Sequence, residues 1–257
     1  MRGPGIRTGG AGADAVAACY GPAMIVAIDS TDLRLTDAPL NFAVRHGEAI
    51  AAHWQRATAA NARLWNGPQF LFTEVSVEGG VLAGTAHRTD FATFLYWRDH
   101  GRDPSATHIT GTSLPLTADG ALLAIRMAGH TANAGQLYFP AGSLDPADAI
   151  DGAIDIDTNI RRELAEETGL APAPETFDAA MVGSRADNAW HVARRCRLPL
   201  SFEACAERVR AHQARTGDDE VDAVLAIRSP AQAAPLRDYA RALALWHFDD
   251  QEKGERR

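Results

Sequence analysis

Residues 142–170 read GSLDPADAIDGAIDIDTNIRRELAEETGL. Near the end of this stretch, Glu163, Glu166 and Glu167 are separated by three and four residues. On an α-helix these positions occupy one arc of roughly 100°, so the three carboxylates converge on one side. The stretch therefore predicts a helix with an acidic face, preceded by a loop.

The predicted helix covers residues 157–168. Asp157 or Thr158 is a suitable residue to cap its first turn, and Gly169 is a suitable residue to end it. Both ends of the helix are therefore marked in the sequence.

The acidic face has a chemical interpretation and a structural one. Ile160 and Leu164 form the stripe that faces the core, and Glu167 lies between them, so we expect its carboxylate to be partly buried. A buried carboxylate is costly unless it is paired or binds a metal, and converging carboxylates suit Mg²⁺ or Mn²⁺. The alternative is a solvated acidic face on which Arg161 and Arg162 are ordinary surface charges.

Residues 162–170, RELAEETGL, resemble the second half of the Nudix hydrolase signature, R-E-U-x-E-E-x-G-U, where U is aliphatic. Upstream, Gly142 is followed after five residues by Asp148, where the family has a glutamate. Residues 139–142, FPAG, resemble the F-P-G-G segment that enters the family's loop, with Ala141 in place of one glycine.

The resemblance implies an α/β fold: an α/β/α sandwich with a mixed β-sheet, preceded here by a small N-terminal α+β module. It implies hydrolysis of a nucleoside diphosphate linked to another group, with Mg²⁺ or Mn²⁺ as cofactor. Arg162 is then expected to orient a carboxylate. The implied metal ligands are the Gly142 carbonyl, Asp148, Glu163, Glu166 and Glu167.

The spacing departs from the family pattern. The family has seven residues between the loop acid and the arginine, whereas residues 149–161 give thirteen here, and Ile154 occupies the strict family position of the acid. Two interpretations are open. In the favoured interpretation Asp148 keeps the role of the loop acid, and six residues bulge out with a turn at Gly152. In the other interpretation the role of the loop acid is lost. Asp155 or Asp157 could also substitute for Asp148.

Other residues are assigned with less support from the pattern. The family commonly takes a further acid from outside the signature, and the acidic loop before residues 223–228 offers Glu220, then Asp219, although a solvated loop is the alternative. Arg126 follows an apolar run and is in a position to meet phosphate. The residues expected to line a substrate pocket are Tyr138, Asn188, Trp190 and His191.

Two substrate classes are suggested by similarity. Residues 135–145, GQLYFPAGSLD, are similar to coenzyme A diphosphatases, but Thr131 and Asn133 replace the arginine and histidine of those enzymes. The front half is loosely similar to animal UDP-glucose and UDP-galactose pyrophosphatases, which favours a nucleotide-sugar-like diphosphate. Coenzyme A or dinucleotide hydrolysis and a non-catalytic ligand-binding module remain alternatives.

We expect residues 1–24 to be mobile, 25–104 to form the N-terminal module, 105–250 to form the Nudix domain and 251–257 to be a tail. Within these ranges the sequence predicts strands at 25–28, 69–77, 81–87, 108–117, 121–128, 136–139, 177–185, 190–199 and 223–228, and helices at 41–65, 91–101, 202–215 and 230–246.

The composition limits the partners. The chain has 257 residues and a net charge of −8, which argues against nucleic-acid binding. Its three cysteines show no CxxC spacing, so we expect a reduced cytoplasmic protein. No run approaches eighteen consecutive apolar residues, so we expect no membrane association. The expected partner is a small nucleotide-diphosphate substrate, and a homodimer is possible in this family.

Overall fold

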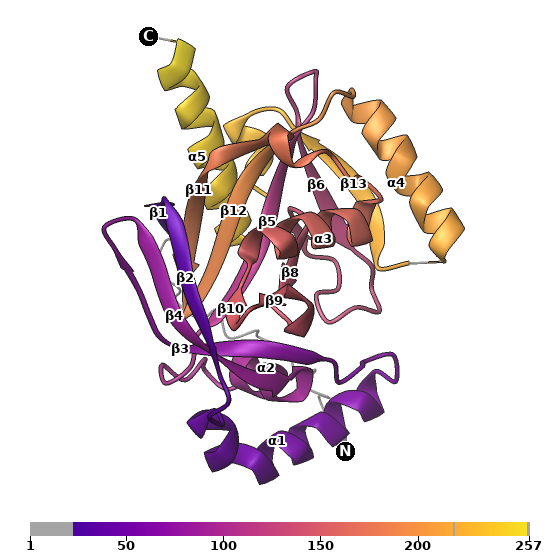
Figure 1. The fold of residues 1–257 in the computed structure, drawn as a ribbon. Helices are drawn as coiled ribbons and strands as arrows, with labels where there is room; N and C mark the ends of the chain where they lie inside the picture. Colours follow the sequence, from indigo (N-terminus) through magenta and orange to yellow (C-terminus); the bar gives the residue numbers. More distant parts are fainter. Residues whose placement is uncertain (1–22, 218, 256–257) are drawn as a thin grey trace, which may run out of the picture.

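The computed structural model describes residues 23–217 and 219–255, and the predicted mobile N-terminus falls almost wholly outside them. Two β-sheets form its frame (Figure 1). The strands of the larger sheet are β1 (Met24–Ile28), β5 (His108–Leu116), β6 (Leu122–Met127), β7 (Leu137–Tyr138), β8 (Ala141–Ser143), β11 (Phe177–Ala186), β12 (Ala189–Arg197) and β13 (Val221–Ile227).

The larger sheet is mixed, as predicted. Its main strands lie in the order β1-β11-β12-β5-β6-β13, with β7 beside β6 and β8 beside β5. β5 and β12 run parallel, whereas the other pairs are antiparallel. β5 is buried along nearly its whole length because it occupies the middle of the sheet.

The smaller sheet has five strands in the order β3-β4-β2-β10-β9. Its members are β2 (Ser30–Thr36), β3 (Pro68–Glu78), β4 (Val81–Asp90), β9 (Ala149–Ile150) and β10 (Ala153–Ile154). β3 and β4 form the predicted hairpin, which turns at Gly79 and Gly80, both with positive φ. β2 was not predicted from the sequence.

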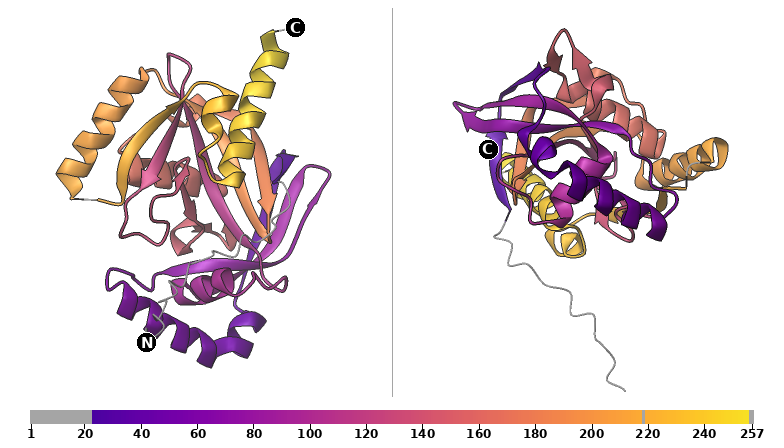
Figure 2. Two further views of the ribbon diagram at one scale, coloured as in Figure 1. Left: turned by 180° about the vertical axis from the view of Figure 1, so that it is seen from behind. Right: turned by 90° about the horizontal axis from the view of Figure 1, so that it is seen from below.

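Five α-helices are present in the described residues: α1 (Asn41–Ala60), α2 (Phe91–Asp99), α3 (Ile156–Thr168), α4 (Phe202–Thr216) and α5 (Asp238–Glu255). α3 and α4 lie on one face of the larger sheet and α5 on the other, as the two opposite views in Figures 1 and 2 show. α1 and α2 pack against each other beside the smaller sheet. The α/β/α sandwich expected from the sequence is confirmed.

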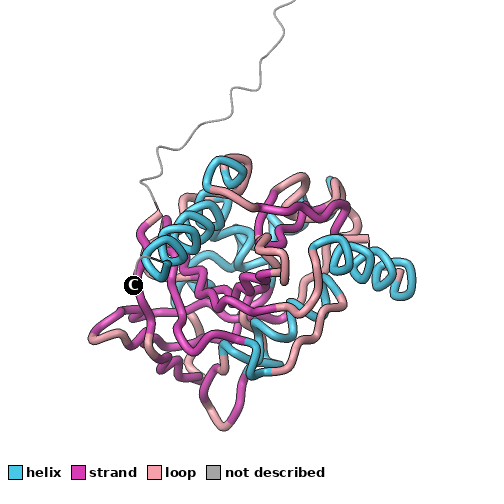
Figure 3. Tube along the Cα trace, turned by 90° about the horizontal axis from the view of Figure 1, so that it is seen from above, coloured by secondary structure: helices cyan, strands magenta, loops and turns pink. Residues whose placement is uncertain are grey.

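The core joins both sheets. One cluster of buried side chains contains Phe70 and Phe72 from β3 together with Ile109 from β5 and Ile160 from α3. Figure 3, a view from above, shows the strands running between the peripheral helices. Because β1 pairs with β11 and β10 pairs with β2, each sheet also contains strands from both predicted sequence ranges.

Two helix boundaries differ from the prediction. The predicted helix at 230–246 is a short 3-10 helix at Pro230–Ala233 followed by α5, which continues to Glu255 through part of the predicted tail. The predicted helix at 41–65 ends at Ala60. Among the described helices, none combines the length and the apolarity that crossing a membrane would require.

The residues that exceed the family spacing form a small hairpin instead of an irregular bulge. β9 and β10 pair through Ala153–Ile150 and Ile154–Ala149, around a turn at Asp151 and Gly152 with φ values of 50° and 79°. An Asp-Gly pair with positive φ at both positions is favoured in two-residue hairpins. β10 then pairs with β2, so the insertion extends the smaller sheet.

Candidate active site

The helix α3 presents its acidic face away from the core. Ile160 and Leu164 are fully buried, as predicted. The helix begins one residue earlier than expected, at Ile156: its N-cap is Asp155, whose carboxylate accepts hydrogen bonds from the backbone N–H groups of Asp157 and Thr158. The prediction that Asp157 or Thr158 caps the helix was wrong because the hairpin delivers the chain to Asp155 already in an extended conformation. Gly169 ends the helix at φ 68°, as predicted.

A short strand brings the loop backbone next to these glutamates. β6 pairs with β5 only at Leu116, and β8 takes its place beside the Thr110–Thr112 segment of β5. As a result, Ala141 and Gly142 lie directly against α3. The FPAG segment of the sequence is therefore the backbone that faces the acidic helix.

Two of the glutamates contact this backbone closely. The Ala141 N–H donates to Glu167 Oε2 at 2.9 Å. A β-carbon at Gly142 would lie 1.9 Å from Glu163 Cδ, so the Glu163 carboxylate occupies the space that any larger residue would need. Glycine is required at this position by close approach and not by its backbone angles.

Arg162 connects the carboxylates on both sides of it. Its guanidinium lies 2.9 Å from Glu163, 3.0 Å from Glu166 and 3.1 Å from both Asp145 and Asp148. Burial opposes its charge, but the hydrogen bonds to Asp148 and the adjacent carboxylates together raise the pKa of Arg162. The prediction that Arg162 orients a carboxylate agrees with this geometry.

Asp148 remains at the site despite the insertion. Its side chain is fully buried, and it is the last residue of the 3-10 helix Pro146–Asp148, immediately before β9. Its two carboxylate oxygens accept hydrogen bonds from Arg162, from the Asn159 side chain and from the Asp145 N–H. Asp155 caps α3 and Asp157 pairs with Arg194.

Glu163 is the most strongly perturbed acid at the site. Its side chain is 14% exposed. Burial raises its pKa to about 7, Arg162 opposes this shift, and Glu166 and Asp148 add to it. A carboxylate whose charge is only partly compensated in this way is suited to a further cation.

The oxygen donors at the site are of the kind that Mg²⁺ binds. Carboxylate and carbonyl oxygens are the ligands this ion prefers, and the absence of a side chain at Gly142 lets the Glu163 carboxylate lie against the backbone there. Within 23–217 and 219–255, however, no three metal-ligating side chains lie close enough together to hold an ion. The oxygen donors fit the chemistry of Mg²⁺, while Glu163 and Glu166 are each paired with Arg162 in this structure.

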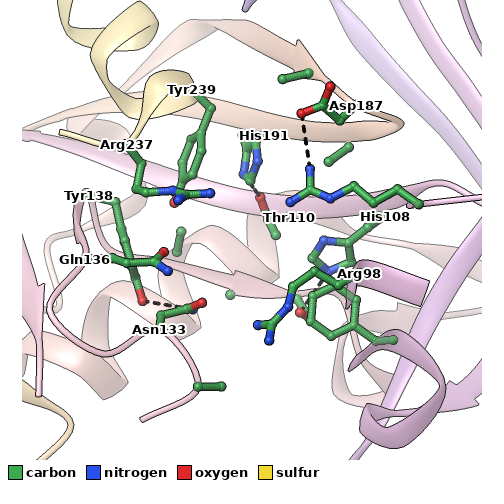
Figure 4. Close-up of a pocket in the computed structure, with 18 of the residues that line it drawn as sticks. Arg98, His108, Thr110, Asn133, Gln136, Tyr138, Asp187, His191, Arg237 and Tyr239 are labelled. Carbon is green, nitrogen blue, oxygen red and sulfur yellow. Dashed lines mark hydrogen bonds and ion pairs between the residues drawn. The ribbon is translucent and has the colours of Figure 1, made fainter. Parts of the chain in front are cut away.

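A pocket of about 480 Å³ opens beside β8, within the size range of small-molecule sites. Ala141 and Gly142 form one wall, which connects the pocket to the acidic helix. Phe94 and Arg98 of α2 and Tyr239 at the start of α5 also line it, and Figure 4 labels Arg98 and Tyr239. The pocket thus lies between the sandwich and the N-terminal helices.

Three arginines line this pocket (Figure 4). Arg98 is paired with Asp99, and Arg102 lies 3.8 Å from Asp187. For Arg237 the part of the chain that the structure describes offers no ion pair and no side-chain hydrogen bond. A cation in a pocket without a carboxylate partner is available to an anionic ligand.

Aromatic and imidazole rings also line the pocket. His191 stacks on Tyr239 with ring centroids 3.5 Å apart, and its Nδ1 lies 2.7 Å from Thr110 Oγ1. His108 lies 4.4 Å from the Phe94 ring and contacts Ser143 Oγ. Burial lowers the pKa of His108 to about 3 and that of His191 well below its ordinary value, so both rings are neutral at pH 7.

Only two of the four residues predicted to line the pocket do so. Tyr138 and His191 line the pocket, whereas Trp190 is buried against Gly183 and lies under Arg185. Asn188 donates to the Arg102 carbonyl. Arg126 pairs with Asp222 at the surface, which leaves its predicted phosphate contact without support from the geometry.

The acidic loop before β13 is close to the pocket side of the site. Glu220 is exposed, its carbonyl accepts from the Ala128 N–H, and its charge contributes to raising the pKa of Tyr138, for which burial is the larger cause. Asp219 is held by Arg63 at 2.6 Å. Of the two acids, Glu220 is the one whose charge acts on a residue that lines the pocket.

Sequence reasoning missed the pocket residues contributed by other elements. Phe94, Arg98, Arg102, Arg237 and Tyr239 belong to no linear motif. They come together only because α2 and the start of α5 both border this pocket. The sequence signal available for them was weak: an aromatic and basic helix at 91–101.

No protein-family model and no curated protein matches the chain. Solved structures that it resembles include a MutT protein from Methanosarcina mazei Go1 at 20% identity, with a TM-score of 0.37 over 57% of this chain and 96% of that one. A NUDIX hydrolase from Nitrosomonas europaea matches at 16% identity, with a TM-score of 0.37 over 58% and 90%.

The NUDIX domain of Shewanella oneidensis NrtR, solved with ADP ribose, matches at 18% identity, with a TM-score of 0.40 over 61% of this chain and 97% of that domain. These identities and TM-scores are too low to carry an argument about activity. The functional assignment therefore rests on the residues of α3, β8 and the pocket.

Proposed function

We propose that this chain is a Nudix hydrolase that cleaves the diphosphate bond of a nucleoside diphosphate linked to another moiety, with Mg²⁺ or Mn²⁺. The observation that carries the proposal is the contact of Glu163 and Glu167 with the backbone of Ala141 and Gly142, on the wall of the pocket. This contact joins the two separated halves of the signature in one place.

The proposed metal ligands are Glu163, Glu166, Glu167 and the Gly142 carbonyl. A divalent ion bound there would neutralise phosphate oxygens and lower the pKa of a water molecule. The contribution of the protein is to hold the carboxylates in position, and Arg162 does this for Glu163 and Glu166. Glu220 is the proposed further acid, as base or extra ligand.

For Asp148 we propose a different role from direct metal binding. All the hydrogen bonds its carboxylate accepts come from Arg162, Asn159 and the Asp145 N–H. A carboxylate so occupied stabilises Arg162 and the loop. Its role as a metal ligand, implied by the family resemblance, stays a prediction.

The pocket is the proposed substrate site. Its arginines suit the phosphates, and its aromatic side chains suit a base or sugar ring. A nucleotide-sugar-like diphosphate is favoured because residues 25–104, which supply Phe94 and Arg98, are those that resemble the UDP-sugar pyrophosphatases. The buried free thiols of Cys196 and Cys205 agree with the cytoplasmic location that we propose.

Two alternatives are separated by one experiment. The chain is incubated with Mg²⁺ and, in turn, UDP-glucose, UDP-galactose, ADP-ribose, NADH, coenzyme A and a dinucleoside polyphosphate. Hydrolysis of a UDP-sugar supports the proposal, and hydrolysis of coenzyme A or a dinucleotide alone corrects the substrate class. Tight binding without cleavage of any compound would identify a ligand-binding module, a possibility raised by the incomplete metal cluster.

A further inference from the structure

Asn159 is a fully buried polar residue on α3, one turn before Glu163, and the signature assigns it no role. Its side chain makes three hydrogen bonds to three different segments. Its Oδ1 accepts from the Gly111 N–H of β5 at 3.1 Å. Its Nδ2 donates to the Ser143 carbonyl of β8 at 3.1 Å and to Asp148 Oδ2 at 2.8 Å.

The three partners are the segments whose relative positions matter at the site. Gly111 pairs with Gly142 in the sheet, and Ser143 follows Gly142 directly. Asp148 is the acid that holds Arg162. One amide therefore links the helix that carries the glutamates, the backbone that faces them and the loop acid.

Asn159 packs closely against Gly111 of β5. A β-carbon at Gly111 would lie 2.3 Å from Asn159 Oδ1 and 2.9 Å from Ile160 Cγ1. Gly111 therefore lets α3 approach β5 closely enough for the amide to reach the backbone. A buried amide with all these partners satisfied resists displacement, because losing any of them exposes a buried polar group to an apolar surrounding.

The need for such a link follows from the insertion. The hairpin β9–β10 separates Asp148 from α3 in the chain and pairs with β2 of the smaller sheet. Between the loop acid and the helix, the direct contacts are those of Asn159 and Arg162 with Asp148 and the N–H bond from Asp155 to the Asp148 carbonyl. Arg162 is shared among several carboxylates, whereas Asn159 has fixed geometry.

We propose that Asn159 is a positioning residue, which holds Asp148, β8 and α3 in register so that Glu163 and Glu167 face Gly142. This inference rests on the proposed function, because it assigns Asn159 to the same metal site. The residue itself touches neither metal nor substrate and acts through Asp148 and Ser143.

The test measures binding of Mn²⁺ alone by electron paramagnetic resonance, with thermal unfolding as a second readout. The variants are Asn159→Ala and Asn159→Asp, which remove the same donor but differ in volume. Thr117→Val is the matched control, because Thr117 is also buried and makes two hydrogen bonds to Ala121 at the β5–β6 turn, away from α3.

Residues that orient ligands through hydrogen bonds typically change metal affinity by about 10–100-fold when replaced. We expect both Asn159 variants to weaken Mn²⁺ binding by about 10-fold or more, while Thr117→Val changes it by less than about twofold at a similar loss of unfolding temperature. Wild-type Mn²⁺ affinity in both Asn159 variants, or an equal loss in Thr117→Val, overturns this inference alone. A wild-type chain that binds no Mn²⁺ overturns the proposed function together with it.

Discussion

The carboxylate of Glu163 lies directly over the α-carbon of Gly142, where a β-carbon would come within 1.9 Å of Glu163 Cδ. These residues are far apart in the motif and belong to α3 and β8. Their contact brings the loop segment that contains β8 against α3, the helix that carries the three glutamates.

Replacing Gly142 with alanine tests this contact. The added β-carbon would push Glu163 or β8 away, and a displacement of about 1 Å at a catalytic group can cost on the order of 100-fold in rate. We expect kcat for the best substrate of the panel to fall by about 100-fold. Gly47→Ala in α1, where nothing lies within 4 Å, is the control and should leave kcat unchanged. Equal activity of the two variants would contradict the proposed role of the contact.

Asp148→Asn tests whether the loop acid stabilises Arg162. Asp148 is fully buried and lies 3.1 Å from the guanidinium, so its neutralisation leaves Arg162 with less compensation. Removing one partner of a buried ion pair lowers the free energy of unfolding by about 3–5 kcal/mol. Because the Arg162 side chain is 21% exposed, we expect a loss of about 3 kcal/mol. Urea unfolding measures this change. Asp151→Asn, at the exposed hairpin turn, is the control, and a similar small effect in both variants would show that the pair is unimportant.

Arg237→Ala tests the pocket as the substrate site. The loss of a charged hydrogen bond to phosphate costs about 1.5–3 kcal/mol, which corresponds to an increase in KM of roughly 10-fold or more. In the proposed function the chemistry takes place at α3, so we expect kcat to change little. Arg241→Ala, one turn later on α5 and paired with Asp238, is the matched control. A KM that is unaffected by Arg237→Ala would place the substrate elsewhere.

His108 gives a prediction for stability against pH. Burial lowers its pKa in the folded chain to about 3 from the ordinary 6.5. Between these values the unfolded chain binds the extra proton, so the free energy of unfolding falls as pH decreases from 6.5 toward 3. The slope from this residue is at most about 1.4 kcal/mol per pH unit.

Urea unfolding at pH 5 and pH 6.5 measures that slope. His108→Gln keeps a polar group near Ser143 but removes the titration, so we expect a shallower dependence in the variant. The same dependence in both proteins would mean that His108 is not buried as a neutral ring.

Much of the fold follows from local patterns in the sequence. The glycines at 79 and 80 mark the β3–β4 hairpin, and Asp90, a residue type that favours helix N-caps, caps α2. The acidic face of α3 and its buried stripe follow from the spacing of Glu163, Leu164 and Glu167. These features depend on neighbouring residues only, so the sequence displays them directly.

The features that were missed depend on tertiary contacts. β10 consists of two residues and exists because β2 offers an edge for pairing, so the pattern of residues 149–154 does not display it. Arg237 and Arg98 share a pocket only because α2 and the segment that starts α5 both border it. Trp190 and His191 are neighbours that were both predicted to line the pocket, but the strand alternation turns Trp190 into the core.

The central claim is that Glu163 and Glu167 hold the metal that cleaves a nucleoside diphosphate derivative. The most direct measurement is the release of product from the substrate panel, with Mg²⁺, by wild type, Glu167→Gln and Glu163→Gln. We predict cleavage by wild type and a loss of at least about 100-fold in the rate of product release in both variants, because the metal ligands supply most of the electrostatic stabilisation of the transition state. Cleavage by either variant at the wild-type rate would contradict this claim.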